Sequence, residues 1–136
     1  MIDVEMDAQI PVDEDGLVAR ARWVLGRLGI TRASVGISVV GPERMAEING
    51  EFRDKLEPTD VLAFPIDGDD GAEVVAAWPT NGPPPELGDI VICPDAAEEP
   101  LPTLVVHGLL HLLGHDHEID RGEMLALQDQ LVDDAP

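Results

Sequence analysis

Four histidines lie within eleven residues of this chain, and it contains no others. His107 and His111 are four residues apart, so on a helix their side chains lie on the same face, one turn apart. Gly114 tolerates the left-handed conformation that ends a helix, which lets the chain turn and bring His117 back toward the first two. Three imidazoles that meet at one point and leave a fourth position open form the ligand set of a catalytic zinc site. We therefore predict that His107, His111 and His117 bind one zinc ion.

Three further residues must be considered as members of this site: two that lie between the predicted ligands His111 and His117, and the one cysteine of the chain. His115 lies beyond the glycine, where a turn residue can point toward the metal, toward a substrate or away from both. Asp116 can orient a ligand imidazole through a hydrogen bond or cap the next helix, and capping is the interpretation that we favour. Cys93 follows an apolar run, so we expect a small buried side chain there rather than a further ligand.

The spacing of the three predicted ligands is similar to the zinc signature of the metzincin proteases, H-E-x-x-H-x-x-G-x-x-H. In those enzymes the glutamate after the first histidine is the general base that activates the attacking water. This chain has Gly108 at that position. The sequence therefore predicts a zinc hydrolase site that lacks the base of a protease.

The chain also resembles the YbeY family of bacterial endoribonucleases, in three blocks that follow one another in the family's order. The family's histidine block reads HGxLHLxGYDH, and this chain reads HGLLHLLGHDH. In the family, an asparagine and an aromatic–arginine pair precede a strand like TDVLSFP, and a later strand reads LGDIVI. The matching positions here are Asn49, Phe52, Arg53 and residues 59–65, 87–93 and 107–117.

This resemblance implies a single-strand-specific, zinc-dependent endoribonuclease of the cytoplasm. It implies a role in maturation of the 3′ end of 16S ribosomal RNA and in ribosome quality control, with RNA and the small ribosomal subunit or its proteins as partners. It also assigns catalytic roles to Arg53 and to the ligand His107. Two alternatives stay open: a metzincin-like metallopeptidase, which Gly108 argues against, and a non-catalytic ribosome assembly factor whose metal is structural.

The chain departs from the family pattern at three places. His115 stands where the family usually has tyrosine, and Ala63 where it usually has serine. The family normally has a helix-length segment before the histidine block, but here only CPDAAEEPLPTLVV separates Ile92 from His107. Much of that helix is therefore expected to be absent.

The charge of the chain is unusual for a protein that acts on RNA. The formal net charge is −20, with eight basic residues against 28 acidic ones. Such a chain repels RNA at long range, although six of the basic residues lie between Arg20 and Arg53 and leave room for a local basic patch. The acidic N-terminal stretch lacks the basic segment of a signal peptide, and the longest apolar run is too short to span a bilayer. We expect a cytoplasmic protein without membrane association.

The periodicity of apolar residues predicts an α+β fold in which residues 1–136 form a single compact domain. We expect a mixed β-sheet flanked by helices, with the zinc ligands on a helix in the C-terminal half and on the turn after it. Strands are predicted at 2–10, 34–40, 60–64 and 88–93, and helices at 13–28, 42–53, 104–113 and 118–131. The segment 67–86 is rich in Asp, Gly and Pro and is predicted to be a loop with a short strand at 74–78.

Arg53 gives the first testable prediction. It is either one more charge at a helix end or, as the resemblance implies, a clamp for a phosphate. In the second case Arg53→Ala should lose RNA processing by roughly a hundredfold, about 3 kcal/mol, while metal content and fold are kept. Arg53→Lys should recover only part of the rate, because an ammonium cannot make the bidentate contact. The test is the cleavage rate and zinc content of both variants; unchanged processing in Arg53→Ala would leave only the helix-end charge.

Overall fold

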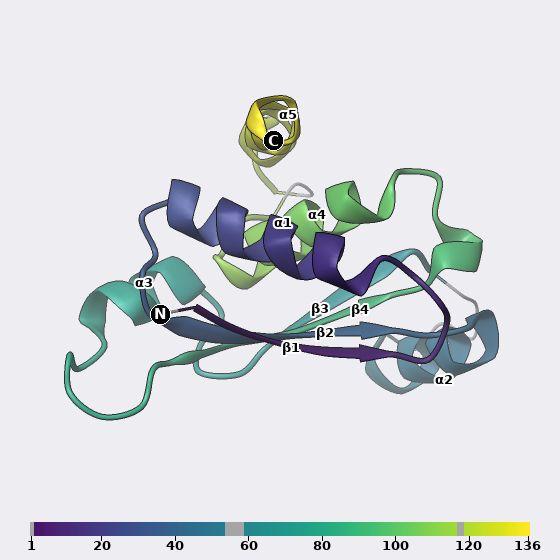
Figure 1. Ribbon diagram of the computed structural model, residues 1–136, viewed down its shortest axis with the longest axis horizontal. Helices are drawn as coiled ribbons and strands as arrows, with labels where there is room; N and C mark the ends of the chain where they lie inside the picture. Colours follow the sequence, from purple (N-terminus) through teal and green to yellow (C-terminus); the bar gives the residue numbers. More distant parts are fainter. Residues whose placement is uncertain (1, 54–58, 117–118) are drawn as a thin grey trace.

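The computed structural model describes residues 2–53, 59–116 and 119–136, with Arg53 described in its backbone only. The order of the elements is β1 (Ile2–Ala8), α1 (Glu14–Arg27), β2 (Ala33–Val39), α2 (Pro42–Arg53), β3 (Val61–Pro65), α3 (Gly71–Ala77), β4 (Glu86–Ile92), the 3-10 turn η1 (Pro94–Ala96), α4 (Leu101–Leu112) and α5 (Glu123–Asp134). Figure 1 shows the sheet nearly edge-on, with helices on both sides of it. The predicted α+β domain with a mixed sheet is confirmed.

The four strands form one sheet in the order β1-β2-β4-β3. β1 pairs with β2 and β2 with β4 in parallel, whereas β3 runs antiparallel to β4. β1 and β3 are therefore the two edge strands among the described residues. The antiparallel β3 is the edge that α4 contacts.

The two faces of the sheet are covered unequally. On one face α1 and α4 pack against the strands, and α5 packs on α4 in turn (Figure 1). Their apolar side chains form the larger core, in which Ile37, Ile90 and Leu109 are almost fully buried. On the other face α2 covers a smaller cluster that includes Met45, Leu62 and Cys93. Burial of Cys93 confirms the prediction of a small hydrophobic residue, on the face opposite to α4.

Most predicted elements are confirmed to within a few residues, but the strand predicted at 74–78 is wrong. The chain there forms α3, Gly71–Ala77. The side chain of Asp70 accepts a hydrogen bond from the backbone N–H of Glu73, which caps the first turn of the helix. This cap and the surrounding alanines favour a helix over the strand preference of the two adjacent valines.

The last helix begins later than the predicted residue 118, which lies outside the described residues. Gly122 has a φ of 96°, a left-handed conformation that no helix interior contains. The carboxylate of Asp120 accepts hydrogen bonds from the N–H groups of Gly122 and Met124 and so caps α5. The helix cap predicted for Asp116 is therefore wrong, because Asp120 performs that function.

The segment before the histidine block is as short as the sequence indicates. Residues 93–100 form only the turn η1 and a brief link, after which α4 begins at Leu101 with a proline in its first turn. No helix in the described part of the chain is long and apolar enough to cross a membrane.

Gly108 allows α4 to lie close to the sheet, which gives a second prediction. A Cβ atom at Gly108 would lie 2.7 Å from Cγ2 of the fully buried Ile90, too close for any real contact. Overpacking of this kind costs about 1–3 kcal/mol, whereas alanine gains only about 0.5–1 kcal/mol over glycine in a helix. Gly108→Ala should therefore lower the free energy of unfolding measured by urea denaturation.

The matched control is Gly26 in α1, where a Cβ atom would meet nothing within 4 Å. Gly26→Ala should raise the free energy of unfolding by about 0.5–1 kcal/mol. If Gly108→Ala were as stable as Gly26→Ala, the close approach of α4 to Ile90 would not exist in solution.

Candidate metal centre and its pocket

Helix α4 is buried on every side except the one that carries its two histidines. Its other residues from Thr103 to Leu112 are buried, and only His107 and His111 are half-buried. A helix packed on so many sides cannot rotate to carry these two rings elsewhere. Their i, i+4 spacing places both on one face, as predicted.

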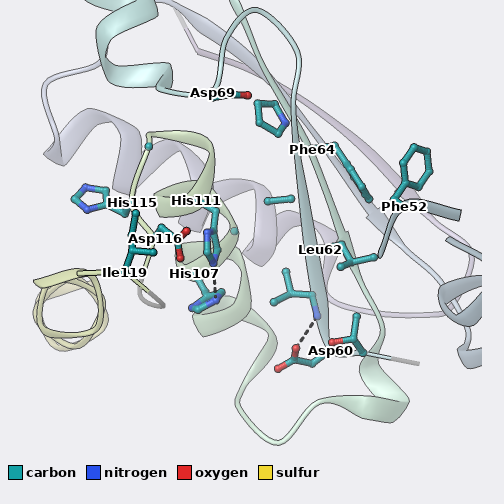
Figure 2. Close-up of a pocket in the computed structure, with 16 residues that line it drawn as sticks. Phe52, Asp60, Leu62, Phe64, Asp69, His107, His111, His115, Asp116 and Ile119 are labelled. Atoms are coloured by element: carbon teal, nitrogen blue, oxygen red, sulfur yellow. Dashed lines mark hydrogen bonds between the residues drawn. The ribbon is translucent and has the colours of Figure 1, made fainter. Parts of the chain in front are cut away.

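The two imidazoles meet through corresponding nitrogens. Nε2 of His111 lies 3.2 Å from Nε2 of His107, and the rings are tilted by 72° with centroids 4.8 Å apart. Figure 2 shows both rings at the wall of one pocket, joined by a dashed line. Two nitrogen lone pairs so close repel each other unless a proton or a cation lies between them.

The orientation of His107 is fixed from a second helix. Nδ1 of His107 lies 2.7 Å from Oε1 of Gln128 on α5. Because that oxygen can only accept, Nδ1 must donate its proton, which leaves the lone pair of the neutral ring on Nε2. This is the arrangement in which an outer hydrogen bond prepares a histidine for metal binding.

The described donors fit a zinc ion. Two ligands of a tetrahedral zinc, each about 2.0–2.1 Å from the metal, are about 3.3 Å apart, close to the observed separation of the two Nε2 atoms. The third predicted ligand, His117, lies outside the described residues. Within residues 2–53, 59–116 and 119–136 no group of three or more His, Cys, Asp or Glu could hold a metal ion.

The chain turns sharply where Gly114 was predicted to end the helix. Gly114 has a φ of 97°, and its N–H donates to the carbonyl of His111 while the N–H of His115 donates to that of Leu110. These two bonds form a Schellman motif. A Cβ atom at Gly114 would also lie 2.8 Å from Cγ of Asp70, so the position needs glycine for two reasons.

The pocket beside the histidines has a volume of about 910 Å³. Its walls come from β3, from α4 and the turn after it, and from the end of α2. The described lining includes three aspartates, Asp60, Asp69 and Asp116, and neither lysine nor arginine. His115 also lines the pocket, but Figure 2 shows its ring directed away from the His107–His111 pair.

Three of the arginines that could form a local basic patch have partners outside the pocket. Arg27 pairs with Asp134, Arg44 pairs with Glu47 on its own helix, and Arg32 donates to backbone carbonyls of residues 79–82. Arg53 is the last residue of α2, directly after Phe52, which lines the pocket. Its side chain lies outside what the structure describes, so its predicted role remains a prediction.

Several residues of this site could not be predicted from the sequence. Gln128 is one of them, because a lone glutamine in an amphipathic helix carries no signal. The pocket-lining roles of Asp60, Asp69 and Phe64 were also missed, since they depend on how β3 and the following loop pass α4. The block around TDVLAFP was the available signal for Asp60 and Phe64.

Three comparisons place the chain among known proteins. The sequence profile described as "Endoribonuclease YbeY" matches residues 6–135. Proteins named Endoribonuclease YbeY from Micrococcus luteus and Streptomyces griseus are 38% and 36% identical to it, over 96% and 97% of this chain and 89% and 88% of their own. Both alignments span more positions, 145 and 150, than the 136 residues of this chain, so these relatives contain residues that it lacks.

The fold has a solved counterpart as well. The solution structure of a Thermotoga maritima protein matches 98% of this chain and 87% of its own, with a TM-score of 0.56 and 25% sequence identity. The profile match over nearly the whole length, together with relatives well above 30% identity, settles the affiliation. The chain belongs to the endoribonuclease YbeY family.

Proposed function

We propose that this chain is a zinc-dependent endoribonuclease that cleaves single-stranded segments of ribosomal RNA precursors, in maturation of the 3′ end of 16S ribosomal RNA and in ribosome quality control. The observation that carries the proposal is the pair of Nε2 atoms 3.2 Å apart at the wall of an open pocket. Family membership supports cleavage of RNA, since the relatives are named as endoribonucleases. The ribosomal substrate and the small subunit as partner rest on the resemblance of the three sequence blocks.

The residues of this chain have distinct parts in such a reaction. His107, His111 and His117 would hold the ion, and the hydrogen bond from Nδ1 of His107 to Gln128 would leave the Nε2 lone pair of His107 for it. When bound, zinc supplies Lewis acidity, which stabilises negative charge on the phosphate and makes water more acidic. Arg53 would bind a phosphate oxygen. The carboxylates of Asp60, Asp69 and Asp116 are the described acidic groups of the pocket that can accept a proton.

The metallopeptidase alternative is disfavoured by the place of Gly108. Its Cα faces Ile90 of β4, so a side chain at this position would be directed into the sheet. A general base like that of the metzincins therefore has no room at residue 108. The assembly-factor alternative requires a closed set of four ligands, and the described residues bring together two histidines that open onto a pocket.

Cleavage by highly purified protein tests the proposal directly. Zinc-loaded protein should cut a single-stranded RNA oligonucleotide and leave a duplex of the same sequence intact. His111→Ala, purified in the same way, should cleave at least about a hundredfold more slowly, the scale of losing one group that stabilises the transition state. Equal cleavage by His111→Ala would identify a contaminating nuclease, and zinc-dependent turnover of casein would identify a peptidase.

Gln128 provides a fourth prediction, which concerns zinc affinity alone. Gln128→Leu removes the acceptor for Nδ1–H of His107 and should weaken zinc binding roughly 10- to 100-fold, as loss of an outer hydrogen bond typically does. Gln128→Glu keeps an acceptor oxygen and should keep the affinity. The measurement is competition with a chromophoric chelator.

The control for this prediction is Gln130→Leu, which changes an exposed glutamine on the same helix and should bind zinc like the unmodified chain. Circular dichroism of each variant checks the fold. An unchanged dissociation constant in Gln128→Leu would show that the hydrogen bond does not prepare His107 for the metal.

A further inference from the structure

Both phenylalanines of this aromatic-poor chain line the same pocket. The sequence contains two phenylalanines, two tryptophans and no tyrosine. Phe52 at the end of α2 is 65% exposed, and Phe64 of β3 is half-buried behind it. The ring centroids are 4.9 Å apart with a tilt of 57°. A large apolar ring held against a second ring and left open to a pocket is suited to stacking on a flat ligand.

The pocket extends around the free edge of β3. Figure 2 shows Phe52 and Phe64 on one side of this strand and His107 and His111 on the other, and all four line the pocket. A ligand that reaches from the histidines to the phenylalanines must therefore cross the strand edge.

The edge of β3 offers hydrogen-bonding groups at this crossing. Two hydrogen bonds show that the even-numbered residues of the strand direct their backbone groups toward β4. Cys93 N–H donates to the carbonyl of Asp60, and Ile66 N–H donates to the carbonyl of Leu87. Odd-numbered residues therefore direct their backbone groups outward. The N–H of Val61 is bonded to the carboxylate of Asp60, and a proline at 65 has no N–H. Ala63 is thus the residue of β3 with both N–H and C=O available at the outer edge.

The negative charge of the pocket favours recognition of RNA by aromatic stacking and backbone hydrogen bonds. Its described lining contains three aspartates and no lysine or arginine, within a chain of net charge −20. The aspartates described there repel phosphates, so charge attraction is disfavoured as the main source of affinity for RNA in this part of the pocket. Stacking on an aromatic ring and backbone hydrogen bonds need no positive charge, and they are a common means of binding single strands.

We propose that Phe52, supported by Phe64, is a nucleobase-binding subsite, and that the adjoining RNA backbone lies across the free edge of β3, hydrogen-bonded to N–H and C=O of Ala63. The inference rests on the proposed function, because it takes RNA as the substrate of this pocket. It explains a requirement for single strands: a base must leave its own stack to lie on Phe52, and a duplex cannot wrap around a strand edge.

A fluorescent base tests the subsite without relying on cleavage. Short single-stranded RNAs that carry 2-aminopurine at successive positions are titrated with the full chain, both zinc-loaded and after treatment with a chelator. At one position the fluorescence should be quenched by stacking. Phe52→Leu should abolish this quenching and weaken binding roughly 5- to 150-fold, the range for one stacked base. Phe52→Trp should restore both.

The control is Leu125→Ala, an exposed apolar residue of α5 outside the pocket, which should change neither signal. The dependence of binding on salt should be shallow, equivalent to roughly one or two phosphates. Quenching that persists in Phe52→Leu would overturn the subsite.

The outcomes separate this inference from the proposed function. If the zinc-loaded chain cleaves RNA while Phe52→Leu still quenches the 2-aminopurine fluorescence, the nuclease function is supported and the subsite is rejected. If the chain does not cleave RNA but the quenching is lost in Phe52→Leu, the subsite is supported and the nuclease function is rejected.

Discussion

Helix α4 lies so close to the sheet that a Cβ atom at Gly108 would be 2.7 Å from Cγ2 of Ile90, and the position of the histidines follows from this close contact. Gly108 removes the side chain that would otherwise separate the helix from Ile90, and the neighbouring positions bury leucines and valines against the strands, α1 and α5. With three sides buried, the remaining side must carry His107 and His111, and it faces β3. The same glycine that permits this packing occupies the position of the protease base in the metzincin signature. Gly108 thus both permits the close contact between α4 and the sheet and leaves the site without the general base of a protease.

The site is built from elements far apart in the sequence, each with one task. α4 supplies two imidazoles, α5 fixes the orientation of one of them through Gln128, and the Schellman turn at Gly114 redirects the chain immediately after the helix. β3 and the end of α2 supply the opposite wall with an open strand edge and an exposed ring. The net charge of −20 disfavours long-range attraction of RNA, so the proposed recognition relies on short-range contacts within the pocket.

Local features of this molecule could be predicted from sequence, and long-range ones could not. The histidine pair and the turn at Gly114 depend on helix geometry and on one glycine, so spacing alone predicts them. The strand expected at 74–78 is wrong because the helix cap that Asp70 provides outweighs the strand preference of the two valines. Gln128 contacts His107 across 21 residues, and Phe52 meets Phe64 only because α2 and β3 converge. No periodicity in the sequence encodes such contacts.

The proposed chemistry requires a metal ion held by imidazoles at the wall of an open pocket. X-ray absorption at the zinc edge of the stoichiometrically loaded protein tests it most directly. We expect nitrogen and oxygen neighbours at about 2.0–2.1 Å from the zinc, and scattering from the more distant imidazole atoms that disappears in His107→Ala/His111→Ala. A sulfur neighbour at about 2.3 Å would place the metal at Cys93, on the other face of the sheet, and would contradict the account.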